Sequence, residues 1–295
     1  MFTKAIVRPP ARNFFEGLTT SGLGTPDYQR ALAEHQAYCA ALERCGLALT
    51  RLEADSDYPD STFVEDAAIL VGVSDGGHTL SARQHHVESE ANPLTQVVLT
   101  TRPGAPSRAG EVGSIRRVLA DLFPAVSEIQ SPGTLEGGDV CEAGNDFFIG
   151  ISERTNESGA QQLAELLAPH GYTSSFVDIR QSGTGVPPVA HARDARATSK
   201  LLHLKSGLAY LGDHRLVVTE TFADRAEFSS YDLIRVNSDE EYAANCVRVN
   251  DQVLVAAGYP RFEGKLRELG YQTIALEMTE FQKMDGGLSC LSLRF

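Results

Sequence analysis

The sequence predicts a mixed α/β fold in which a strand–strand–helix–strand unit repeats. Short runs of strand type alternate with segments of helical periodicity. The predicted strands outnumber the predicted helices by about two to one, whereas a doubly wound parallel sheet needs one helix for each crossover. An arginine-led loop also recurs after predicted strands, at residues 8–10, 102–104 and 154–156. Such recurrence favours repetition of one supersecondary unit.

The predicted strands are short apolar runs, and the predicted helices carry apolar residues at three- and four-residue spacing. The strands are predicted at 5–8, 47–52, 67–73, 96–101, 146–151, 208–212, 216–219, 252–256, 272–275 and 288–293. The helices are predicted at 26–45, 108–123, 157–170 and 260–269, the last with Gly270 as its stop signal. Two polar segments without hydrophobic period, 72–93 and 181–200, are predicted to be surface insertions.

Charge and length exclude several classes of protein. The chain has 295 residues, with 26 Lys and Arg against 39 Asp and Glu, for a formal net charge of −13. This balance argues against nucleic-acid binding, which needs a cationic face, but allows small cationic substrates. No run of 18 apolar residues suggests a membrane span, and the first residues lead straight into the strand-like Ile6-Val7. We therefore expect a cytoplasmic protein without a membrane anchor.

The cysteines indicate reduced thiols. Five of them, Cys39, Cys45, Cys141, Cys246 and Cys290, are widely spaced and form no C-x-x-C pair. Cys290 differs from the others because it follows Gly286-Gly287, and two glycines allow close approach of the backbone to a ligand. For any single cysteine, however, a buried core position is the ordinary interpretation.

Two further residues have a functional and a structural interpretation. His203 is a single imidazole in an apolar segment, where a hydrogen-bonded core histidine is a more ordinary interpretation than a catalytic one. Glu136 precedes Gly137-Gly138, which indicates either a turn or a backbone pressed against another group. Taken one at a time, neither residue identifies a site.

Glu65 and Asp66 directly precede the apolar segment 67–71. Burying these acids would cost several kcal/mol unless a cation met them. They are either a solvated strand end or a pocket for a guanidinium or ammonium group, which paired carboxylates match in geometry and charge.

Six motifs in one order resemble the dimethylarginine dimethylaminohydrolase family, and the resemblance spans nearly the whole chain apart from the two polar segments. The motifs are DSTFVED at 60–66, TRPGAPSR at 101–108, LEGGDV at 135–140, SERTN at 152–156, HLKS at 203–206 and DGGLSC at 285–290. The resemblance implies one catalytic domain over residues 1–295, folded as a five-bladed α/β propeller of ββαβ units, the pentein fold.

The resemblance also implies the role of each site residue. Cys290 would be the nucleophile, His203 the general acid and base, and Glu136 the carboxylate that orients the histidine. The substrate-binding residues would be Asp66 and Glu65 for the guanidinium, Asp60 and the Leu18 backbone for the α-amino group, Arg108 and Arg154 for the α-carboxylate, and the Met284 backbone beside the nucleophile. No cofactor and no metal is implied, and no grouped Cys and His ligands occur. A homodimer is allowed.

The implied reaction is hydrolysis of Nω-methylated arginine to citrulline and an alkylamine through a thiouronium intermediate on Cys290. The alternative within the fold is an arginine deiminase, in which an aspartate typically stands two residues after the histidine. Here that position is Lys205, which favours the methylarginine hydrolase. A binding protein of the same fold is a second alternative, against which the presence of Cys290, His203 and Glu136 together argues.

Overall fold

The computed structural model describes residues 1–72, 96–180 and 201–295. The predicted insertions at 72–93 and 181–200 lie outside these residues, except that Gly72 ends a strand. The helices are α1 (Tyr28–Arg44), α2 (Val112–Leu122), α3 (Glu157–Leu167), α4 (Pro260–Glu268) and α5 (Thr279–Gln282). Among the described residues, none of these helices is both long and apolar enough to cross a membrane.

The described strands form five sheets of three strands each. The sheets are β3 (Ala68–Gly72), β4 (Gln96–Thr100) and β5 (Ser127–Glu128); β6 (Val140–Ala143), β7 (Asp146–Ile151) and β8 (Thr173–Asp178); β9 (Leu208–Tyr210), β10 (Arg215–Val218) and β11 (Asp232–Arg235); β12 (Val247–Val249), β13 (Gln252–Ala256) and β14 (Gln272–Leu276); and β15 (Leu293–Arg294), β1 (Lys4–Val7) and β2 (Ala48–Arg51). In each sheet the middle strand pairs antiparallel with the first strand and parallel with the last. The sequence prediction of a repeated ββαβ unit and a five-bladed propeller is confirmed.

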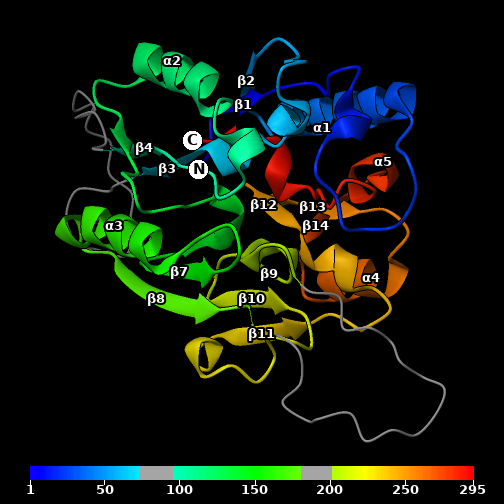
Figure 1. Cartoon of the computed structure of the whole chain (residues 1–295). Coiled ribbons are helices and arrows are strands. Elements are labelled where there is room, and N and C mark those ends of the chain that lie inside the picture. The colour runs from blue at the N-terminus through cyan, green and yellow to red at the C-terminus, as the bar shows by residue number, and fades with distance from the viewer. Residues whose placement is uncertain (73–95, 181–200) are drawn as a thin grey trace, which may run out of the picture.

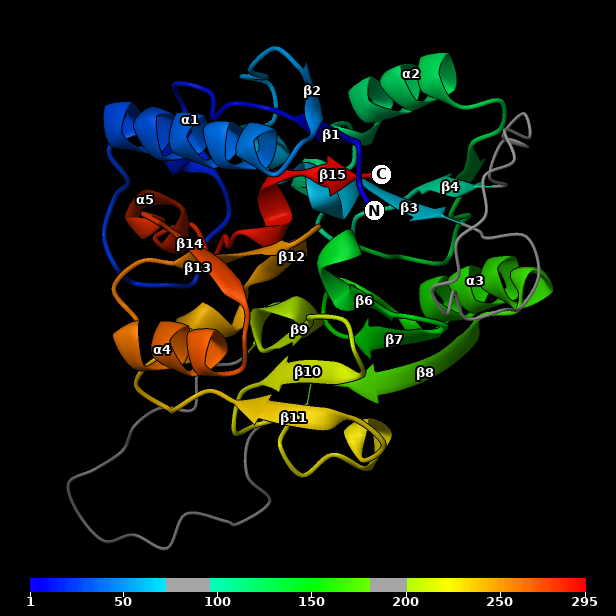
Figure 2. The same cartoon turned by 180° about the vertical axis from the view of Figure 1, so that it is seen from behind.

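Figures 1 and 2 show the sheets arranged in a ring with α1 to α4 on its outside. The ring is closed by the two ends of the chain, because β15 pairs with β1 through Ala5 opposite Arg294 and Ile6 opposite Leu293. A helix stands between the middle and last strands of four units. In the unit of β9 to β11, a 3₁₀ turn at Ala226–Phe228 occupies that place.

Local sequence explains the helices and their packing. Asp27 and Asn156 cap α1 and α3 by accepting the backbone N–H groups of Arg30 and Gly159. Along α3 the buried residues Ala160, Leu163 and Leu167 recur at helical spacing and pack with alternate residues of β7, such as Phe147 and Ile149. Burial of these side chains stabilises the unit by about 25 cal/mol for each Å² of apolar surface removed from water.

One predicted strand is wrong over most of its length. Residues 289–291 form a 3₁₀ turn, and only Leu293–Arg294 are strand. The apolar run that predicted a strand there is buried for another reason, because Leu288 and Leu291 fill the core from an irregular backbone. The short strands β5, β6, β8, β11 and β12 were not predicted, since two to six residues carry little periodicity of their own.

Each of the five units has a 3₁₀ turn shortly before its first strand. These turns are η3 (Val64–Ala67), η5 (Gly137–Asp139), η7 (Leu204–Ser206), η9 (Glu241–Ala244) and η10 (Ser289–Leu291). Contacts join η10 to η3, η3 to η5, η5 to η7 and η7 to η9. Side chains on or beside the turns are therefore brought together although the turns lie far apart in the sequence.

Candidate active site

One pocket gathers nine of the ten residues that the sequence singled out. It is lined by Leu18, Asp60, Asp66, Arg108, Glu136, Arg154, His203, Met284 and Cys290, together with Phe63, Leu202, Asp285 and Gly286. The exception is Glu65, whose carboxylate lies outside the lining. The cavity holds about 20 Å³, room for about one water molecule. A substrate as large as arginine therefore requires side chains of the pocket wall to move apart.

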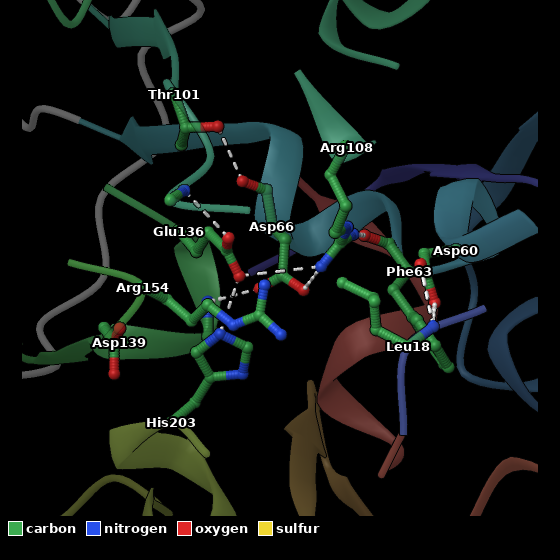
Figure 3. Close-up of polar contacts among 12 residues, drawn as sticks. Leu18, Asp60, Phe63, Asp66, Thr101, Arg108, Glu136, Asp139, Arg154 and His203 are labelled. Carbon is green, nitrogen blue, oxygen red and sulfur yellow. Dashed lines mark hydrogen bonds and ion pairs between the residues drawn. The ribbon is translucent and has the colours of Figure 1, made fainter. Parts of the chain in front are cut away.

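Four charged side chains in the pocket wall form a cluster, shown in Figure 3 and called here the pocket cluster: Asp66, Arg108, Glu136 and His203. His203 Nε2 lies 2.8 Å from Glu136 Oε2. Arg108 Nη1 donates to Asp66 Oδ2 at 2.8 Å and lies 3.6 Å from Glu136 Oε2. All four residues are buried, and each carboxylate has a cationic neighbour, which offsets the cost of removing the charges from water.

The pocket cluster shifts the pKa of its members. Burial lowers the pKa of His203, but Asp66, Asp139 and Glu136 outweigh burial and raise it from 6.5 to about 9. Burial raises the pKa of Asp66, whereas the charges of His203 and Arg108 lower it, to about 2. At neutral pH the structure therefore holds a protonated imidazole that can donate a proton.

Glycine makes this packing possible. The Gly138 N–H donates to Asp66 Oδ1 at 2.8 Å. A Cβ atom on Gly138 would lie 2.8 Å from the His203 ring and 2.9 Å from Asp66 Oδ1, closer than real Cβ atoms come. Any side chain at this position would push the histidine and the aspartate apart, so the Gly-Gly signal of the sequence marks a close approach.

Cys290 lies in η10 and is partly exposed, in contrast to the buried Cys39, Cys141 and Cys246. Burial and the charges of Glu65 and Asp66 raise the pKa of its thiol from 9.0 to about 12. In the empty pocket the sulfur is therefore a neutral thiol. A cation bound beside it would lower that pKa.

Glu65 belongs to a second group of side chains, called here the floor cluster: Glu65, Lys205, Ser289 and Arg294. Lys205 Nζ lies 2.6 Å from Glu65 Oε1, and Arg294 Nη2 lies 3.3 Å from the same oxygen. The Ser289 hydroxyl donates to Glu65 Oε2 at 2.7 Å and lies 3.9 Å from the Cys290 sulfur. Both carboxylate oxygens of Glu65 are thus already bound by groups of the protein.

Asp60 and Arg154 lie in the same pocket and offer opposite charges. The Leu18 N–H donates to both carboxylate oxygens of Asp60 at 3.1 Å. Burial raises the pKa of Asp60, while the charge of Arg108, the Leu18 bond and the charge of Arg154 act in the opposite direction. The half-buried Arg154 side chain extends towards the pocket cluster in Figure 3 and forms no hydrogen bond or ion pair with another described residue. It is available to an anionic group.

Asp66, Glu136 and His203 could also hold a metal ion by their spacing, since one ligand atom from each lies within 4.8 Å of the others. In the structure, the charge of the two carboxylates is already met by Arg108 and by protonated His203. Charge balance therefore favours an acid–base cluster over a metal centre.

Two buried residues of the site were not assigned a role from the sequence. Asp139 Oδ1 accepts the N–H of Leu204, the residue after His203, at 2.9 Å, and its other oxygen accepts the Ser152 hydroxyl. Asn245 follows η9 and contacts both η7 and η10. The signal that could have found them is position, because each lies at the end of a turn shortly before the first strand of a unit.

Comparison with known proteins agrees with this geometry. No protein-family model matches the chain. The chain is 38% identical, over the full length of both proteins, to N(G),N(G)-dimethylarginine dimethylaminohydrolase of Pseudomonas aeruginosa. It is 30% identical to the protein of the same name from Streptomyces coelicolor, covering 99% of this chain and 96% of that one. A structure of a cysteine-to-serine variant of the Pseudomonas enzyme complexed with citrulline superimposes with a TM-score of 0.83, covering 100% of both chains. The chain therefore belongs to the dimethylarginine dimethylaminohydrolase family.

Proposed function

We propose that the protein hydrolyses asymmetric dimethylarginine and monomethylarginine to citrulline and di- or monomethylamine through a covalent S-alkylthiouronium intermediate on Cys290. The observation that carries the proposal is one pocket holding a thiol, a His203–Glu136 pair at 2.8 Å and the carboxylate of Asp66. The names of the Pseudomonas and Streptomyces relatives support the same activity.

The substrate binds with its guanidinium at Asp66 and its α-carboxylate at Arg154. Asp66 is the carboxylate that faces the pocket, whereas Glu65 contributes its charge from the floor cluster. Asp60 and the backbone of Leu18 take the α-amino group, and Arg108, already bound to Asp66, assists at the α-carboxylate. The backbone of Met284 lines the pocket beside the nucleophile. Each charged group of the substrate thus has a partner of opposite charge in the pocket, which favours one orientation.

The first half of the reaction uses a cationic substrate and a protonated histidine. Binding of the guanidinium next to Cys290 lowers the pKa of the thiol, which loses its proton to water. The thiolate attacks the guanidinium carbon and forms a tetrahedral adduct. His203, with a pKa of about 9, then donates its proton to the methylated nitrogen. The C–N bond breaks, the amine leaves and the thiouronium remains on the sulfur.

The second half reverses the role of His203. The imidazole is now neutral and takes a proton from a water molecule, whose oxygen attacks the thiouronium carbon. The C–S bond breaks, the thiolate leaves, and the remaining carbon–oxygen group loses a proton to give the urea of citrulline. Glu136 keeps the imidazole oriented in both halves through its hydrogen bond to Nε2.

Selectivity for methylated substrates rests on the floor cluster. A methylated nitrogen has fewer N–H donors than the unsubstituted one, so it is penalised wherever a buried acceptor needs those donors. Lys205, Arg294 and Ser289 already satisfy the oxygens of Glu65. Methylation therefore strands no acceptor at this carboxylate. The ion pair between Lys205 and Glu65 is therefore the physical reason for the selectivity predicted from Lys205.

The activity is tested by incubating the protein with asymmetric dimethylarginine and quantifying both products. We expect citrulline and dimethylamine in equal amounts, and a mass increase on the Cys290 peptide after rapid acid quenching. The Cys290→Ser variant should give neither product nor adduct. Citrulline formation by the wild type with no adduct at any cysteine would reject the covalent route.

Two further expectations stay predictions. A cytoplasmic location and a homodimer are both compatible with a small cationic amino acid as substrate. Sedimentation equilibrium of the purified protein measures the second directly, because a homodimer would have a mass of twice 31.9 kDa.

A further inference from the structure

The 3₁₀ turns of the five units contribute unequally to the assigned site. Four turns carry or adjoin residues with proposed roles, namely Asp66 on η3, Glu136 before η5, His203 before η7 and Cys290 on η10. The remaining turn, η9, is followed by Asn245, to which no role has been given. Asn245 is 7% exposed and does not line the pocket, so any part it takes in the reaction is exerted through other residues.

The Asn245 amide joins the segments of the two reacting groups. Its Nδ2 donates to the carbonyl of Lys205, two residues after His203, at 2.9 Å. The same nitrogen donates to the Ser289 hydroxyl at 3.0 Å, and its Oδ1 accepts the Ser289 N–H at 2.9 Å. Ser289 is the residue before Cys290. One side chain thus makes three hydrogen bonds, all of them to two other units of the propeller and none to its own turn.

The contact with the nucleophile segment is tight. A Cβ atom on Gly287 would lie 2.5 Å from both Cγ and Oδ1 of Asn245. The Gly287 carbonyl in turn accepts the N–H of Cys290 at 3.2 Å. The backbone that carries the sulfur therefore rests directly on the Asn245 amide, with no space for a side chain between them.

These contacts link the segments of two groups that must act on bonded atoms of one substrate. The sulfur attacks the guanidinium carbon while the imidazole delivers a proton to a nitrogen on that carbon. A displacement of about 1 Å between reacting groups can cost on the order of a hundredfold in rate. Within the described residues, no hydrogen bond joins Cys290 to His203, so their separation depends on the segments that carry them.

We propose that Asn245 is a positioning residue, whose amide holds the Cys290 turn at a fixed separation from the His203 turn. This inference rests on the proposed function, because it requires that both groups act on the same substrate. It assigns Asn245 an effect on kcat rather than on KM, since the residues that bind the substrate lie on other segments.

The test uses two substitutions and a matched control. Asn245→Asp has the same shape and keeps an acceptor but loses both donated bonds, and Asn245→Ala removes the amide without adding a charge. The control is Asn250→Asp, because Asn250 Nδ2 also donates twice, to the carbonyls of Phe2 at 3.0 Å and Cys45 at 2.9 Å, and its Oδ1 accepts the Phe2 N–H. Asn250 does not line the pocket. Its φ of 55° is one that Asn and Asp both tolerate.

We expect kcat for dimethylarginine to fall by about a hundredfold in both Asn245 variants, with KM within about threefold of the wild type. Alkylation of Cys290 by iodoacetamide, which needs neither His203 nor the binding groups, should change by less than about threefold. The control should alter kcat and KM by less than about twofold. If the buried charge unfolds Asn245→Asp, Asn245→Ala decides.

Three results would overturn the inference: an unchanged kcat in Asn245→Ala, a rise in KM without a fall in kcat, or an equal loss in the Asn250 control. Each is distinct from failure of the proposed function. That failure is an inactive wild type, which is measured first in the same assay.

Discussion

The two charged clusters that meet near Cys290 have similar compositions and different uses. The pocket cluster faces the cavity, and the floor cluster does not line it. The difference is clearest at Glu65 and Asp66, neighbours in sequence whose carboxylates enter different clusters. A 3₁₀ turn has three residues per turn, so adjacent side chains on η3 point about 120° apart. The two adjacent acids therefore point to different places: Asp66 lines the pocket, and Glu65 accepts the hydroxyl of Ser289, the residue before Cys290.

The largest effect is expected at the sulfur that lies beside both clusters. Cys290→Ser should lower kcat by at least about a thousandfold with the fold unchanged, because a hydroxyl is a far weaker nucleophile than a thiolate. Cys246→Ser is the matched control, since Cys246 is buried and does not line the pocket. Full activity of Cys290→Ser together with an inactive Cys246→Ser would show that Cys290 is not the nucleophile.

The comparison of clusters is tested by removing one charge from each. Asp66→Asn should lower kcat/KM by about a hundredfold or more, because the guanidinium loses its ionic partner in a buried site. Glu65→Gln should lower kcat/KM by only about tenfold, since the substrate does not contact it. The two variants differ by one position and are measured in the same steady-state assay. Equal losses would show that the clusters are not functionally distinct.

A pH profile tests the pocket cluster alone. Since His203 must be protonated to release the amine, kcat/KM should fall as pH rises through about 9. Glu136→Gln removes a charge that raises this pKa and leaves only a weaker, neutral acceptor for the imidazole, so the alkaline limb should move towards 6.5. The raised pKa of His203 also stabilises the fold below pH 6.5, and that contribution is lost between 6.5 and about 9. The melting temperature should therefore fall less over this interval in Glu136→Gln than in the wild type. If the alkaline limb of the pH profile did not move in Glu136→Gln, Glu136 would not control the pKa of His203.

The smallest effect is expected from Lys205 in the floor cluster. Lys205→Met removes the ion pair at 2.6 Å and leaves Glu65 Oε1 with only the longer contact to Arg294 at 3.3 Å, so this acceptor is less completely satisfied. An unpaired acceptor is worth roughly 1–3 kcal/mol, so the preference for dimethylarginine over arginine should shrink by on the order of tenfold. Lys205→Arg keeps the charge and should retain most of the preference. If Lys205→Met kept the same preference for dimethylarginine over arginine, the floor cluster would not determine the selectivity.

The sequence predicted which residues meet more reliably than it predicted how they meet. The motifs around Asp66, Glu136, His203 and Cys290 were sufficient to place four turns at one pocket. The Lys205–Glu65 pair and the Asn245 bridge could not be predicted, because each joins residues from different units whose spacing depends on closure of the ring. The long helices were predicted correctly because their apolar residues recur at helical spacing. The apolar residues 288–293 were predicted to be a strand, but burial alone does not distinguish a strand from a turn.

The most direct test of the account is the ratio of kcat/KM for asymmetric dimethylarginine to kcat/KM for arginine in the wild-type protein. An amine-specific assay that distinguishes dimethylamine from ammonia measures both reactions with the same preparation. The account predicts a ratio above about ten, and little or no turnover of symmetric dimethylarginine, which carries a methyl group on each terminal nitrogen and so presents one to Asp66. Efficient conversion of arginine to citrulline and ammonia, with both methylated substrates inert, would contradict it and identify an arginine deiminase.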